Sequence, residues 1–166
     1  MAVLAAKFSE VQEELPALVA AVAARPAMRL VIKTHPAETA DVYGPVTQGV
    51  PNISVTGPDE DLAGLLAATD AVVTMNSTVA IDALVLGLPS LVLGLPNNLS
   101  PFVEAGAMIG VAAGEPPDAA IEALLYDRSA REALLQRGAA FAARYGMRTD
   151  GAAATRAADL ILGMMA

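Results

Sequence analysis

The chain contains one histidine, His35, and its neighbours make it a candidate for ligand chemistry. It lies in the stretch VIKTHPAE, after an apolar run, with Lys33 two residues before it and Pro36 directly after it. A residue before proline favours extended backbone, so we expect His35 to continue a strand. Alternate residues of a strand share one side, which would place Lys33 beside His35. The pair suits an anionic ligand, and a loop histidine bonded only to nearby backbone is the alternative.

A second polar stretch, Asn76, Ser77 and Thr78, follows another apolar run and precedes an apolar helical pattern. All three residue types favour the start of a helix, so an ordinary helix cap explains them without a ligand. Free N–H groups and hydroxyls at a helix start also bind anions. Phosphate binding is therefore the second interpretation of this stretch.

Asp82 is the only charged residue from Asn76 through Gly94. Its helical neighbours are apolar, so we expect the helix to be buried on nearly every side and the carboxylate to need a partner. Thr78 and Asp82 are four residues apart and share a helix face. A phosphate on Thr78 would leave Asp82 for ribose hydroxyls, whereas a bond to a neighbouring loop is the alternative.

Apolar runs of four to six residues alternate with helical patterns along the whole chain, and this alternation predicts the elements that position these side chains. The predicted strands are 2–5, 28–33, 52–57, 70–75, 89–94 and 108–113. The predicted helices are about 9–24, 38–48, 59–68, 77–86, 117–126, 129–145 and 151–164. This order predicts an α/β fold, a doubly wound, mostly parallel Rossmann-like sheet with helices on both faces. We expect residues 1–166 to form a single such domain, with the last helices packed on the sheet.

Ligands of such sheets bind beyond the carboxyl ends of the strands, so the loops there decide the function. They contain no GxGxxG dinucleotide motif, no P-loop and no GxSxG nucleophile motif. The loop from Gly94 to Asn98 is a candidate for contacts to a base or sugar, although Asn97 and Asn98 are also ordinary turn formers. In the acidic loop GPDEDL we expect Asp59 to cap the next helix.

Composition excludes several classes of function. The chain of 166 residues has no cysteine and a single histidine, which disfavours thiolate and catalytic zinc sites, and we expect no metal or cofactor. A net charge of −8 disfavours nucleic-acid partners and anionic membranes. No apolar run reaches the ~18 to 20 residues that span a bilayer, and we expect no secretory signal. These features favour a cytoplasmic protein.

The stretch KTHP, followed later by NSTVAIDALVLGLPSLVLG, resembles the carboxyl-terminal, donor-binding half of GT-B glycosyltransferases. The resemblance is closest to the capsule-polysaccharide and sialyl- and Kdo-transferase-like group, which has HP and Ser/Thr motifs. It implies that His35, Ser77 and Thr78 contact the phosphate or nucleotide of a CMP-sugar. In the wider GT-B fold an acidic residue on the following helix binds ribose, and Asp82 occupies that place with a shorter side chain than the commoner glutamate.

These observations predict the nucleotide-sugar-binding half of a glycosyltransferase of surface or capsular polysaccharide synthesis. Its donor would be CMP-, CDP- or UDP-linked, and His35, Lys33 and the helix start at Ser77 would stabilise the leaving phosphate without a metal. An amino-terminal acceptor domain would be missing from this chain. The alternatives are a UDP-N-acetylglucosamine 2-epimerase-like or CDP-glycerol phosphotransferase-like half, and a non-catalytic binding or dimerisation module. The terminal helices of such a module would form a homodimer or dock on another domain.

Overall fold

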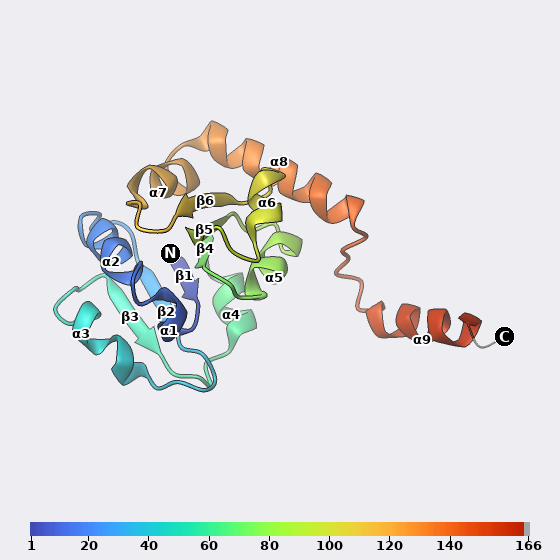
Figure 1. Cartoon of the computed structure of the whole chain (residues 1–166), viewed down its shortest axis with the longest axis horizontal. Helices are drawn as coiled ribbons and strands as arrows, with labels where there is room; N and C mark the ends of the chain where they lie inside the picture. Colours follow the sequence, from blue (N-terminus) through green and yellow to red (C-terminus); the bar gives the residue numbers. More distant parts are fainter. Residues whose placement is uncertain (165–166) are drawn as a thin grey trace.

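Each of the short apolar runs forms one strand of a single parallel sheet in the computed structural model, which describes residues 1–164 (Figure 1). The strands are β1 (Ala2–Ala5), β2 (Leu30–Lys33), β3 (Ile53–Thr56), β4 (Ala71–Thr74), β5 (Ser90–Leu95) and β6 (Ile109–Ala112). Their order across the six-stranded sheet is β3-β2-β1-β4-β5-β6, and every neighbouring pair is parallel. The predicted doubly wound α/β fold is therefore confirmed.

Helices cover both faces of the sheet. The helices within residues 1–164 are α1 (Phe8–Val11), α2 (Leu15–Ala23), the 3-10 helix η1 (Ala40–Tyr43), α3 (Gly44–Thr47), α4 (Leu62–Ala67), α5 (Val79–Val85), α6 (Ser100–Glu104), α7 (Asp118–Leu125), α8 (Arg128–Arg144) and α9 (Ala153–Met164). Helices α2 and α7 pack on one face, where their side chains form a core with Leu4 and Ile32. Helices α4, α5 and α8 contribute to cores with Val72 or Val92 on the other face. Adjacent strand residues thus enter opposite cores, which explains why the runs are apolar at every position.

Proline decides where two predicted helices break. The helix predicted for residues 9–24 is two helices, because Pro16 has no N–H and is tolerated only in the first turn of α2. The helix predicted for residues 38–48 is η1 followed by α3, with Pro45 in the first turn of α3. The segment after β5 likewise runs into α6, whose first turn contains Pro101. Apolar spacing alone did not predict these breaks.

The carboxylate that caps α4 is Asp61, not Asp59 as the sequence analysis predicted. Its oxygens accept hydrogen bonds from the Ala63 and Gly64 amides at 3.0 and 3.1 Å. The backbone turns before the helix, since the Glu60 amide donates to the Gly57 carbonyl. This turn delays the helix start to Leu62, so Asp59 lies too early to reach its free amides.

The last helix, α9, contradicts the prediction that both terminal helices pack on the sheet. Figure 1 shows it lying away from the sheet after an extended segment, whereas α8 packs on α5 and α7. Leu160, Ile161, Leu162 and Met164 of α9 are all exposed. Its amphipathic pattern therefore predicted a helix correctly but not its place. Among residues 1–164, no helix has the length and apolar character needed to cross a membrane.

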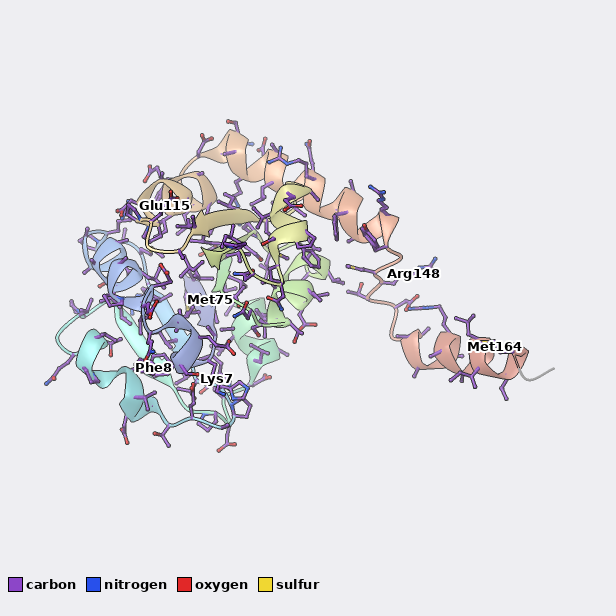
Figure 2. All side chains as sticks on the ribbon, viewed as in Figure 1. Lys7, Phe8, Met75, Glu115, Arg148 and Met164 are labelled. Atoms are coloured by element: carbon purple, nitrogen blue, oxygen red, sulfur yellow. The ribbon has the colours of Figure 1, made fainter. Side chains whose placement is uncertain are left out.

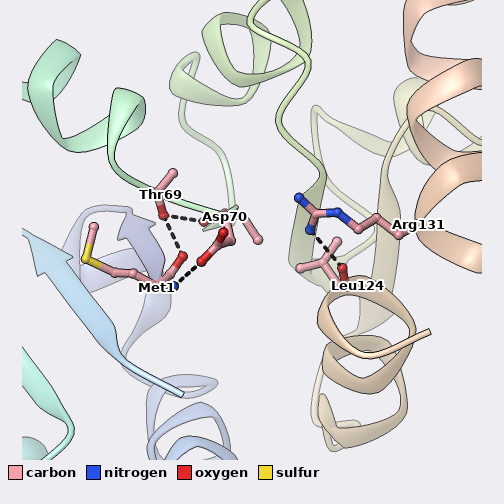
Figure 3. A network of polar contacts seen from close by, with 6 residues as sticks. Met1, Thr69, Asp70, Leu124 and Arg131 are labelled. Atoms are coloured by element: carbon pink, nitrogen blue, oxygen red, sulfur yellow. Dashed lines mark hydrogen bonds and ion pairs between the residues drawn. The ribbon is translucent and has the colours of Figure 1, made fainter. Parts of the chain in front are cut away.

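Polar contacts connect neighbouring segments near the amino ends of the strands (Figure 3). The Asp70 carboxylate pairs with the Met1 ammonium, which holds the pKa of that carboxyl below its usual range, and Thr69 Oγ1 donates to the Met1 carbonyl at 2.8 Å. Arg131 Nη1 of α8 donates to the Leu124 carbonyl at 3.2 Å, joining α8 to α7.

Asn52 provides a test of the fold that is independent of function. Its Nδ2 lies 2.8, 3.1 and 3.0 Å from the carbonyl oxygens of Val22, Arg25 and Met28, and so joins the end of α2 to the start of β3. We expect Asn52→Ala to lower the free energy of unfolding by ~1 to 3 kcal/mol, because part-buried carbonyls lose their donor. Urea unfolding measures this change. The exposed Asn98, whose Nδ2 has one carbonyl partner, is the comparison, and an equal effect of Asn98→Ala would contradict the prediction.

Candidate functional site

The candidate site is a cavity of about 490 Å³ at the carboxyl ends of β1, β2 and β4. In this sheet the strand order reverses between the neighbours β1 and β4, and ligands of doubly wound sheets bind at such a switch point. The lining residues come from the loops that follow these strands and from the β3–α4 loop. They are Ala5, Ala6, Lys7, Glu10, Lys33, Thr34, His35, Pro36, Pro58, Glu60, Leu62, Asn76, Ser77, Thr78 and Val79. The structure thus brings together the two polar stretches that the sequence analysis singled out.

His35 lies exposed at the cavity, and its ring is held by the turn that follows it. Its Nδ1 accepts a hydrogen bond from the Ala37 amide at 3.1 Å, and its carbonyl accepts one from the Glu38 amide at 2.9 Å. A ring nitrogen that accepts a hydrogen bond carries no proton, so the proton of the neutral imidazole is on Nε2. Nε2–H is therefore available as a donor to a ligand.

Lys33 lies at the end of β2 and is only 8% exposed. Its Nζ donates to the Pro58 carbonyl at 2.6 Å and to the Thr34 carbonyl at 3.2 Å, and it takes part in none of the ion pairs found within residues 1–164. A buried ammonium without a counter-charge is costly, and it has three hydrogens to donate. An anion in the cavity would supply the missing negative charge.

The Asn76–Thr78 stretch supports both of its interpretations. Ser77 Oγ accepts a hydrogen bond from the Val79 amide at 3.3 Å, which is an ordinary contribution to a helix start. The Ser77 amide donates to Thr74 Oγ1 at 3.3 Å, and that hydroxyl donates to the Ala5 carbonyl at 2.7 Å, which fixes the β4 loop against β1. Thr78 is exposed, lines the cavity and makes no capping bond with its side chain. The stretch is therefore partly a cap and partly open to a ligand.

Asp82 lies outside this cavity, and the expectation that its helix is buried on nearly every side was wrong. Helix α5 covers the sheet with Ala80, Ala83 and Leu84, while Asp82 is exposed on its outer face and needs no protein partner. It lines a neighbouring cavity of about 750 Å³ between α4 and α5. Leu62 lines both cavities, so the two are adjacent.

Gly94 and Asn97 line neither cavity, and the structure gives both a local purpose. Gly94 has a φ of +66°, and a Cβ atom there would overlap the side chain of Met75, which Figure 2 labels. Asn97 closes the turn after β5: its Nδ2 donates to the Leu93 carbonyl and its Oδ1 accepts from the Leu99 amide, each at 2.9 Å. Their contacts to a base or sugar stay a prediction.

Two acidic residues of the cavity, Glu10 and Glu60, were not singled out as site residues by the sequence analysis. Glu10 belongs to α1 and Glu60 to the β3–α4 loop, and both are exposed. Acidic side chains at this wall would repel phosphate and direct it toward Lys33 and Ser77. Both residues follow shortly after the carboxyl end of a strand, Glu10 after β1 and Glu60 after β3. This position in the sequence was the signal that could have indicated them.

This sheet order, with a cavity at its switch point, defines the class of fold as a doubly wound, Rossmann-like α/β domain. The model of the family of capsule polysaccharide biosynthesis proteins matches residues 3–98, more than half of the chain. The chain belongs to that family. None of the curated proteins matches it by sequence.

Solved structures with the same fold include glycosyltransferases and epimerases. A UDP-GlcNAc 2-epimerase from Neisseria meningitidis bound to UDP-GlcNAc is 17% identical with a TM-score of 0.72, covering 98% of this chain and 44% of that one. The calicheamicin glycosyltransferase CalG4 is 19% identical with a TM-score of 0.66, covering 98% and 41%. The lipopolysaccharide glycosyltransferase WaaG is 17% identical with a TM-score of 0.58, covering 98% and 47%. The chain thus spans less than half the length of each of these proteins.

Proposed function

We propose that this chain is the donor-binding half of a glycosyltransferase that takes part in making a capsular or other surface polysaccharide. The observation that carries the proposal is the meeting of Lys33, His35 and the Ser77–Thr78 pair in one cavity at the switch point. The family of the chain supports the polysaccharide, and its fold supports the class of enzyme. The donor would be a CMP-, CDP- or UDP-linked sugar.

The cavity offers the donors that a nucleotide phosphate requires. The Lys33 ammonium supplies positive charge and takes part in none of the ion pairs found within residues 1–164, His35 supplies Nε2–H, and Thr78 supplies a hydroxyl. During transfer, the bond between the anomeric carbon and the phosphate oxygen breaks, and negative charge grows on that phosphate. Donors already held in place stabilise this charge more in the transition state than in the ground state.

Asp82 retains a place in this proposal through the second cavity. It lies one turn after Thr78 on α5, and the cavity that it lines is adjacent to the phosphate-binding one. A phosphate on Thr78 would direct the ribose along α5, where the exposed Asp82 carboxylate accepts hydrogen bonds from its hydroxyls. The exposure of Asp82 thus favours a ligand contact over a contact with a protein loop.

Titration with CMP, CDP and UDP tests the proposal. A nucleotide at a hundred times its Kd should stabilise the fold by ~2.7 kcal/mol, seen as a rise in the melting temperature. Cytidine and uridine at the same concentrations are the controls, and they should stabilise it far less because they lack the phosphate. In a chemical-shift map, the amides near His35 and Ser77 should move most. Binding elsewhere, with these amides unmoved, would contradict the proposed site.

A further inference from the structure

Glu38 connects the two loops that form neighbouring walls of the cavity. Its carboxylate belongs to the turn after β2, yet both of its oxygens lie 3.0 Å from the Phe8 amide at the start of α1. Helix α1 has no side-chain cap of its own, because Lys7 occupies its N-cap position. Glu38 therefore provides from another loop the acceptor that the first turn of α1 lacks.

A buried tyrosine reinforces this connection. Tyr43 is fully buried, and its hydroxyl lies 3.1 Å from the Ala6 carbonyl and 3.4 Å from Glu38 Oε2. Burial, together with the charge of Glu38, raises the pKa of the Tyr43 hydroxyl, so this group remains a donor. The Phe8 and Tyr43 rings meet edge to face with centroids 5.2 Å apart. The carboxylate is thus held at a fixed place between the two loops.

The backbone of Glu38 is also bonded to the backbone of His35. The Glu38 amide donates to the His35 carbonyl at 2.9 Å, within the turn that also holds the imidazole. A change in the place of Glu38 would therefore move the start of α1, including Lys7, relative to His35. Both of those side chains line the cavity, whereas Glu38 does not.

We propose that Glu38 is a positioning residue, which sets the distance between the β1–α1 loop and the His35 turn and so shapes the cavity for its anionic ligand. The inference rests on the proposed function, since it concerns the same cavity. What matters is the reach of the side chain and its ability to accept a hydrogen bond, because the bonded group is a neutral amide.

Two substitutions separate reach from charge. Glu38→Gln keeps the length of the side chain and one acceptor oxygen but removes the charge, whereas Glu38→Asp keeps the charge and is shorter by one methylene. We expect Glu38→Asp to raise the Kd for the nucleotide that wild type binds by about 10-fold. This is the scale of one lost hydrogen bond between the cavity and the charged phosphate of the nucleotide. Glu38→Gln should stay within about 3-fold of wild type. Glu122→Asp, at an exposed residue of α7, should leave the Kd unchanged.

The measurements are calorimetric titration at a temperature where all variants are folded, and a chemical-shift map of each variant with and without CMP, CDP or UDP. In Glu38→Asp the amides of Lys7 and Phe8 should shift in the free protein, while those near Ser77 keep their positions. If both variants bound the nucleotide as tightly as wild type, the inference about Glu38 would be overturned while the proposed function stood. A greater loss of nucleotide affinity in Glu38→Gln than in Glu38→Asp would have the same consequence. Failure of wild type to bind any of the three nucleotides would instead overturn the proposed function.

Discussion

Replacing His35 by alanine should weaken nucleotide binding by ~1.5 to 3 kcal/mol, about 10- to 150-fold, because one hydrogen bond to a charged phosphate is lost. The imidazole is exposed and its own contact is with the Ala37 amide, so the fold should tolerate the change. Calorimetric titration with the nucleotide that stabilises wild type measures the loss. An unchanged Kd, with the fold intact, would show that His35 is only a turn residue.

The tautomer of His35 allows a sharper version of this test. The Ala37 amide donates to Nδ1, so the proposed ligand contact is made by Nε2. The amide nitrogen of glutamine reaches about as far from the backbone as Nε2, and that of asparagine about as far as Nδ1. We therefore expect His35→Gln to keep more of the affinity than His35→Asn. The reverse order would contradict the assignment of Nε2 as the donor.

The 166-residue chain alone should bind a donor nucleotide yet transfer no sugar. Transfer requires a base within ~3 Å of the acceptor hydroxyl, to take its proton as the oxygen attacks the anomeric carbon. The sole histidine is assigned to the phosphate, and Asp61 is bonded to the first amides of α4. Activity should appear only when an amino-terminal acceptor-binding half is supplied, and a product assay with each class of donor sugar measures it.

Turnover by the chain alone would contradict that prediction, and two carboxylates would then be the first candidates for the base. Glu10 and Glu60 both line the cavity and are exposed. Glu10→Gln and Glu60→Gln would identify the base by a loss of turnover without a matching loss of nucleotide affinity. Turnover that survives both substitutions would mean that the chain contains a catalytic group elsewhere.

The fold of this protein could be predicted from its sequence because the signals are local. Runs such as AVLA and LVIK are apolar at every position, which is typical of strands buried on both faces, and helical patterns separate them. The predicted helix bounds and helix cap were wrong where a second local feature outweighed the one on which the prediction was based. Pro16 restarted a helix that the apolar spacing continued, and a turn before α4 moved its cap from Asp59 to Asp61.

The sequence by itself determined which loops meet at the carboxyl edge, since parallel strands bring all of those loops to the same side. On this ground Lys33, His35 and Ser77 are expected at the same edge of the sheet. Strand order was not determined in this way. That β1 lies between β2 and β4, so that their loops form one cavity, depends on packing between segments far apart in the chain.

Only the tertiary structure decided the partners of the side chains at the site. The exposure of Asp82 depends on which face of α5 meets the sheet, and an apolar helix with a single charge does not specify that face clearly. The bond from Lys33 to the Pro58 carbonyl and the bond from Phe8 to Glu38 join different loops. Residue type and spacing describe a residue's near neighbours along the chain, whereas these bonds arise from the three-dimensional approach of loops that the folded sheet holds together.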